Sequence, residues 1–183
     1  MIRQYSDQLV RGFLQNLDSG DAIACLLNPE ALSVALTVNY AAKATQGGDF
    51  WRLQYQNTTN PSIEFTLTFD RRIFMRRFMP GGGWDQNLST LVEKFEGMRR
   101  FLMALCYPIG KATDPIRRAP PAVLLVWPSY LAIKAVVKSL KLKDTVWDRF
   151  LYPVVFSADL SFEEIRRYRL SSAEVAKGGM FRG

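Results

Sequence analysis

Apolar and polar residues alternate at every second position in several segments of this chain, a pattern typical of β-strands with one buried face. The clearest case is Ser62–Phe69, in which the odd-numbered residues are apolar and the even-numbered residues are polar. Similar patterns, or short apolar runs bounded by turn residues, predict further strands at Ala22–Leu27, Leu32–Asn39, Trp51–Gln56 and Val154–Phe162. The sequence therefore predicts a mainly β protein.

The most apolar stretch, Pro120–Asp144, reads PPAVLLVWPSYLAIKAVVKSLKLKD and raises three alternatives: a membrane span, a buried helix or a pair of strands. A spanning helix needs about twenty apolar residues without interior charges. Here Lys134, Lys138 and Lys141 interrupt the run, and Pro128 would break a helical hydrogen bond. The stretch is also rich in Val, Ile, Leu, Trp and Tyr, most of which favour strands. We therefore predict two strands, Ala122–Trp127 and about Tyr130–Leu142, and no membrane insertion.

The second of these strands does not alternate evenly. Lys134 and Lys138 have the same parity as Leu140 and Leu142, so a regular strand would place lysines and leucines on one face. A one-residue flip near Val137–Ser139, as in a β-bulge, would return the apolar side chains to a single face. Lys134 and Lys138 must then face a channel, a neighbouring subunit or solvent. A long, bent strand of this kind is typical of a barrel or a strongly curved sandwich.

One segment has a helical period. Apolar residues recur every three or four positions between residues 87 and 105, namely at Leu88, Leu91, Val92, Phe95, Met98, Leu102 and Leu105. This stripe predicts a helix that packs against the core. The resulting order of four strands, one helix and three strands predicts an antiparallel β-barrel or sandwich with a single packed helix.

The domain organisation follows from these elements. Residues 21–165 form the predicted β domain. Residues 1–20 are expected to be an arm or a short amphipathic helix, and residues 166–183 an exposed tail or docking segment.

Between the strand Ser62–Phe69 and the helix, residues 70–86 read DRRIFMRRFMPGGGWDQ and are expected to form an extended loop. Two interpretations are open: a solvated loop with a few buried apolar contacts, or an arm that inserts into a neighbouring subunit, because apolar side chains on a long loop need a partner surface. The second interpretation gives these candidate subunit contacts in the loop and in the tail: Arg71, Arg72, Phe74, Arg76, Arg77, Phe78, Arg166, Arg167, Tyr168 and Arg169.

Composition limits the function classes. The 183 residues are 48% hydrophobic and 22% charged, as in an ordinary globular protein. The net charge of +7 fits a nucleic-acid partner, an acidic protein neighbour or simply a soluble surface. The chain has no histidine, which removes the common catalytic triads, histidine bases and HExxH zinc sites. We expect no enzyme activity, no metal and no cofactor, and we expect Cys25 and Cys106 to be free thiols.

Several segments, taken in order, carry a resemblance. They are LLNPEALSVALTVNY (residues 26–40), SIEFTLTFD (62–70), the helix with VEKFEGMRRFLMALCYP, PPAVLLVWP (120–128) and AIKAVVKSLKLKDTVWDRFLYPVVFSADLSFEEI (132–165). Together they resemble the tube-protein family of contractile injection systems and phage tails over roughly two-thirds of the chain. The sequence departs from the family pattern at Pro128, where a glycine is usual, and before Pro153, where the expected glycine is absent. The turns at these two points can therefore differ in shape from those of the family.

The resemblance implies a tail-tube-like β domain that assembles into a hexameric ring and stacks coaxially with other rings. It implies a structural protein of the virion or injection machine, assembled in the host cytoplasm, with tail tube and baseplate hub proteins as neighbours. The first hypothesis is a baseplate tube initiator or adaptor that joins the tail tube to the central hub and spike. The alternatives are the repeating tail tube subunit and, less favoured, a basic nucleic-acid-binding module. In a phage, DNA would pass through the channel. Residues 166–183 are too short for the LysM module that often follows this domain.

Overall fold

Seven antiparallel strands form one sheet in the computed structural model, which describes residues 11–25, 29–44, 51–78, 88–110, 119–128, 130–166 and 171–176. The strand order is β2-β1-β7-β8-β9-β6-β3. The bounds are β1 Phe13–Asn16, β2 Ala22–Ala24, β3 Leu32–Ala35, β6 Ser62–Asp70, β7 Val123–Trp127, β8 Leu131–Trp147 and β9 Pro153–Glu164. Two more strands, β4 Val38–Ala44 and β5 Trp51–Thr58, pair only with each other. The predicted mainly β, antiparallel architecture is confirmed, and the described part of the sheet is open rather than closed into a barrel.

The predicted register flip in β8 is confirmed. Val137 pairs with Phe162 and Ser139 pairs with Ser161, so Lys138 is an extra residue between two consecutive positions of β9. Before this bulge the odd-numbered residues of β8, such as Ile133, are buried. After it, the even-numbered residues Leu140 and Leu142 turn toward the core, while the lysines between and beyond them are exposed.

The core lies between the sheet and the helix α2, Leu88–Ala104, which confirms the predicted helix. Phe95 of α2 is fully buried and meets Phe156 of β9 edge-on, with 5.1 Å between ring centroids. Phe156 in turn stacks on Phe69 of β6 at 4.7 Å. The alternating apolar residues of the strands therefore meet the helical stripe as their periods predict.

The prediction of an arm or short helix at residues 1–20 is wrong for residues 11–20, the part of this segment that the structure describes. Residues 13–16 form β1, which pairs with both β2 and β7 and places Leu14 in the core. The domain boundary drawn after residue 20 therefore cuts through the sheet, which begins at Phe13. Pairing on both sides outweighs the weak helical pattern of this segment. Residues 1–10 lie outside the described part of the chain.

The prediction of an extended loop at residues 70–86 is also wrong for the first half of this segment. Residues Arg71–Phe78 form the helix α1. The Asp70 side chain accepts a hydrogen bond from the backbone N–H of Arg72 at 2.8 Å, as an N-cap does. Phe74 then packs into the core at 6.3 Å from Phe95, between ring centroids. The cap and this buried anchor explain why the segment is helical. Residues 79–87 lie outside the described part.

The predicted strand Leu32–Asn39 is interrupted at residues 36–37, where β3 ends and β4 begins. The predicted C-terminal tail contains a short helix, α3 Ser172–Ala176, whose residues are exposed. No helix in the described part is long and apolar enough to cross a membrane.

Candidate assembly surfaces

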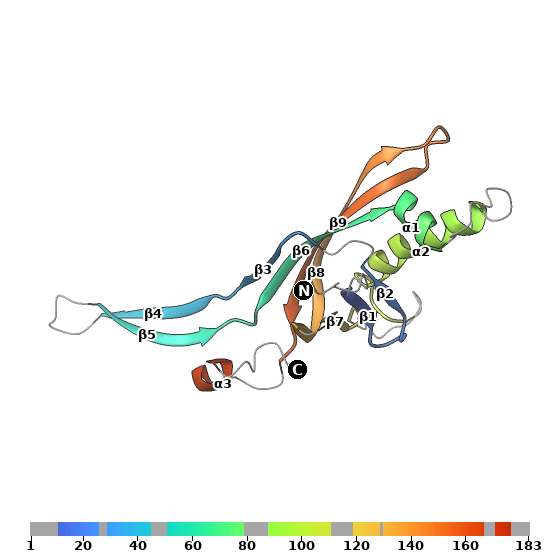
Figure 1. Ribbon diagram of the computed structural model, residues 1–183. Coiled ribbons are helices and arrows are strands. Elements are labelled where there is room, and N and C mark those ends of the chain that lie inside the picture. Colours follow the sequence, from blue (N-terminus) through green and yellow to red (C-terminus); the bar gives the residue numbers. More distant parts are fainter. Residues whose placement is uncertain are drawn as a thin grey trace, which may run out of the picture.

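The hairpin of β4 and β5, which we call the arm, projects from the β3–β6 side of the sheet (Figure 1). Every residue of β5 is exposed, including Trp51 at 70% and Leu53 at 72%. Tyr40 pairs with Tyr55 across the arm, so the aromatic side chains share one face. An isolated two-stranded hairpin is at best marginally stable in water. The arm is therefore suited to gain stability from a partner surface.

The two faces of the arm differ in chemistry. One face of the arm is apolar, because Val38 alternates with Tyr40 in β4 and Leu53 alternates with Tyr55 in β5, and Tyr40 lies across from Tyr55. On the opposite face, Lys43 lies directly across from another cation, Arg52. Like charges in such cross-strand pairs are destabilising.

A second hairpin projects at the other end of the sheet, where β8 turns into β9; we call residues 146–152 the tip (Figure 1). Asp148 fixes the turn, because its Oδ1 accepts hydrogen bonds from the backbone N–H groups of Phe150 (2.8 Å) and Tyr152 (3.0 Å). Leu151 adopts a positive φ of 62°, which side chains other than glycine rarely do. The tip exposes the following large apolar residues: Val146, Trp147, Phe150, Leu151 and Tyr152.

Helix α1 contacts the tip, and helix α2 contacts β8 just before it. Arg71 at the start of α1 donates from Nη2 to Asp148 Oδ2 at 2.7 Å. Arg99 of α2 pairs with Asp144 of β8 at 3.0 Å, between Nη2 and Oδ2. The exposed aromatic turn is therefore pre-organised, which lowers the entropy lost when it binds a partner.

The acid stability of the tip is expected to depend on Asp148. The hydrogen bond from Arg71 and those from the Tyr152 and Phe150 backbone hold the pKa of Asp148 below its ordinary value. A carboxyl whose pKa is lowered in the folded state stabilises that state above its unfolded pKa, about 3.9, and the contribution is lost as pH falls through the lower folded pKa. Asp148→Asn is therefore expected to lower the melting temperature at about pH 6 and to have a diminishing effect toward about pH 3. Thermal melts across this pH range measure the difference, and a difference that stays constant with pH would contradict this role of the carboxylate.

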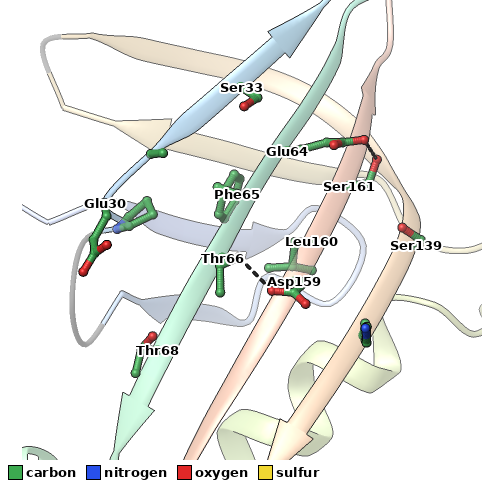
Figure 2. Close-up of a pocket in the computed structure, with 13 residues that line it drawn as sticks. Glu30, Ser33, Glu64, Phe65, Thr66, Thr68, Ser139, Asp159, Leu160 and Ser161 are labelled. Carbon is green, nitrogen blue, oxygen red and sulfur yellow. Dashed lines mark hydrogen bonds between the residues drawn. The ribbon is translucent and has the colours of Figure 1, made fainter.

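A groove of about 770 Å³ crosses the face of the sheet that points away from α2 (Figure 2). Its floor holds two cross-strand pairs between a hydroxyl and a carboxylate. Thr66 donates from Oγ1 to Asp159 Oδ1 at 2.7 Å, and Ser161 donates from Oγ to Glu64 Oε1 at 3.1 Å. Lys141 pairs with Asp159 in the strand register. This outer face is polar and suited to remain in contact with water.

Four of the residues predicted to contact other subunits have described side chains, and these four play different parts in the structure. Arg71 is mostly buried against Asp148, and the Phe74 side chain is only 3% exposed in the chain's own core, so Phe74 offers no surface to a neighbour. Arg72 is largely exposed and pairs with Asp70 at 2.8 Å. Arg166 pairs with Glu164 at 2.7 Å.

The remaining predicted contacts fall beyond the described side chains. Arg76, Arg77 and Phe78 belong to α1, but only their backbone is described. Residues 167–170, which include Arg167, Tyr168 and Arg169, lie outside the described part. Their predicted role stays a prediction.

The two lysines predicted to face a channel, a neighbour or solvent are both exposed in the single chain. Lys138, the extra residue of the bulge, pairs with Glu163 at 2.8 Å between Nζ and Oε2. Lys134 forms no ion pair with any residue in the described ranges. Sequence reasoning missed the arm and the tip as projecting elements, although their alternating or aromatic residues are visible in the sequence.

Comparisons with known proteins agree with the resemblance noted in the sequence. Residues 2–173 match the family described as contractile injection system tube protein. Among solved structures, the chain is similar to a protein in the tail of an empty GTA particle, with a TM-score of 0.43, 10% identity, and coverage of 91% of this chain and 99% of that one. It is also similar to a protein in the baseplate of the anti-feeding prophage, with a TM-score of 0.36, 11% identity, and coverage of 91% and 95%. No curated protein sequence matches the chain.

The family match spans all of the β-strands described above, from β1 through β9. It confirms the resemblance that the order of the sequence segments indicated. The chain belongs to the contractile injection system tube protein family and is a structural tube or tail component of such a system.

Proposed function

We propose that this protein forms a homo-oligomeric ring, expected to be hexameric, that serves as a baseplate tube initiator or adaptor. In this role the ring joins the tail tube on one side to the central hub and spike on the other. The observation that carries the proposal is the rigid, aromatic tip.

The tip supports an adaptor over a repeating tube subunit. In a tube built from copies of one protein, the tip of one copy must bind a surface of another, identical copy. That surface would therefore be present on this chain. The groove found on the described part of this chain includes Phe65 and Leu160, but its floor carries the carboxylates of Asp159 and Glu64. Aromatic side chains seated there would cover these carboxylates and remove their contact with water, which costs free energy. A socket for Trp147 and Phe150 is therefore expected on a different protein.

The polar outer face supports a channel wall. The strands β6, β8 and β9 bury most of their apolar side chains on the α2 side, and the other face carries mainly Ser, Thr, Lys, Asp and Glu side chains. A ring that turns this second face inward would enclose a water-filled channel lined by these residues and by Lys134 and Lys138. If the particle is a phage, DNA would pass through this channel.

The candidate contacts of the helix α1 and of the tail extend the proposal to neighbouring subunits. Arg72 is exposed and adjacent to the tip-holding Arg71. We include it with the remaining candidates, Arg76, Arg77, Phe78, Arg166, Arg167, Tyr168 and Arg169, as contacts to adjacent protomers or rings.

The assembly behaviour of the purified chain tests the proposal. We expect closed rings in electron micrographs and a single oligomeric mass by mass photometry, without growth into tubes, because the socket for the tip is expected on a different protein. Uniform long tubes formed by the chain alone would favour the repeating subunit. Tight, salt-dependent DNA binding by the monomer would favour the nucleic-acid-binding module.

A further inference from the structure

We propose that the arm of one copy pairs with the open edge of β2 in the next copy and so closes the ring. The inference rests on the proposed ring and deepens it by naming the surfaces that meet. The occupant of the arm is a second copy of this chain.

The two partners lie at opposite ends of the strand order. β2 is the outermost strand on one side of the sheet and β3, which leads into the arm, is the outermost on the other. Among the described residues, no strand pairs with the outer edge of β2 or with the outer edges of the two-stranded arm. Such edges readily accept another strand. A contact between different surfaces of identical chains is head-to-tail, and it forms a ring when the rotation that it repeats closes on itself.

The charges of the two edges are complementary. The described part of the arm carries Lys43 and Arg52 and no carboxylate. The turn between β1 and β2 carries Asp18 and Asp21, both exposed. None of these four residues forms an ion pair within the described ranges. Bringing the acidic turn of one copy to the arm of the next would also relieve the repulsion between Lys43 and Arg52.

The apolar faces also continue one another in this arrangement. In the β1–β2 pair, half-buried Ile23 lies directly across from fully buried Leu14 and packs against the core. Leu17, in the turn that follows β1, is 39% exposed. A strand added in the plane of the sheet keeps its apolar face on the same side as Ile23. The exposed stripe of the arm would then extend the apolar layer of the next copy.

A charge-swap experiment tests the pairing in the full-length chain. The arm variant Lys43→Glu/Arg52→Glu and the turn variant Asp18→Lys/Asp21→Lys are each expected to shift the ring toward monomers, with at least a tenfold higher dissociation constant by mass photometry. Combining all four changes is expected to restore the ring. Lys94→Glu/Arg100→Glu, on exposed positions of α2, is the matched control and is expected to leave the ring intact. Circular dichroism checks that each variant is folded.

Covalent capture gives a second readout. Arg52→Cys and Asp21→Cys, placed in one chain with Cys106→Ser, are expected to yield under mild oxidation a ladder of linked protomers that ends at the closed ring. Rings that persist in the arm variant, or a loss of assembly that the charge swap does not rescue, would overturn the pairing while leaving the proposed ring in place. A wild-type chain that forms no ring at any concentration would count against the proposed function itself.

Discussion

Phe156→Ala is expected to destabilise the protein by about 3–5 kcal/mol, the usual cost of removing a buried phenylalanine ring. The Phe156 ring is fully buried and lies between two others. It stacks on Phe69 of β6 at 4.7 Å and meets Phe95 of α2 edge-on at 5.1 Å. Its loss leaves a cavity where the sheet and the helix meet, and a tightly packed core closes such a cavity only partly. The midpoint of urea unfolding, followed by tryptophan fluorescence, measures the loss.

Phe150→Ala is the matched control for this change. The same atoms are removed, but Phe150 is 64% exposed on the tip, where its ring faces Arg149 at 4.6 Å from the centroid to Cζ. The expected change in stability is about 0.5 kcal/mol or less, as for most surface substitutions. Equal effects of the two substitutions would contradict the placement of Phe156 at the centre of the core.

Strand pattern and helix period were sufficient to predict most of the fold. In β6 and β9 one face is buried along the whole strand, so alternation in the sequence reports burial directly. The helix α1 was not predicted, because its stability comes from the Asp70 cap and from Phe74 packing on Phe95, a residue of a different helix. Such a contact is invisible to a pattern read along the chain.

The arm shows a different limit of sequence reasoning. Its alternation is as regular as that of a core strand, and Tyr40, Leu53 and Tyr55 could have faced the chain's own interior. Alternation indicates that a face will be buried, but it does not distinguish burial by the same chain from burial by another. In a protein that assembles with other copies or partners, this ambiguity concerns the subunit contacts, on which the function depends.

The candidate contacts show the same limit at the level of single residues. The arginines after Asp70 were identified as a group, yet they serve different purposes. Arg71 binds Asp148, 77 residues further along the chain, and so stabilises the turn of the tip. Arg72 lies at the surface and pairs with Asp70, the N-cap residue of α1. Only the folded chain brings Arg71 and Asp148 together, so the pre-organised tip could not be predicted from the sequence.

Deleting Lys138 is expected to destabilise the protein by about 3 kcal/mol or more, although the residue itself is exposed. The deletion joins Val137 directly to Ser139 and removes the bulge that separates the two halves of β8. If the first half keeps its register, Leu140 and Leu142 turn outward, which forfeits about 1–2 kcal/mol for each half-buried leucine. The neighbouring lysines would turn toward the core, which adds a desolvation cost.

Lys138→Ala separates the bulge from the side chain. This substitution keeps the extra residue and removes the ion pair with Glu163, in which the lysine side chain is 58% exposed. Exposed ion pairs contribute about 0–1 kcal/mol, so the alanine variant is expected to unfold close to the wild-type midpoint.

If the deletion is tolerated as well as the alanine substitution, the register must be set elsewhere in β8. The irregular pairing between Asp144 and Trp147 is then the candidate position. Hydrogen exchange along β8 and β9 then distinguishes a slipped register, with lost protection around Leu140, from a bulge that has moved toward the tip.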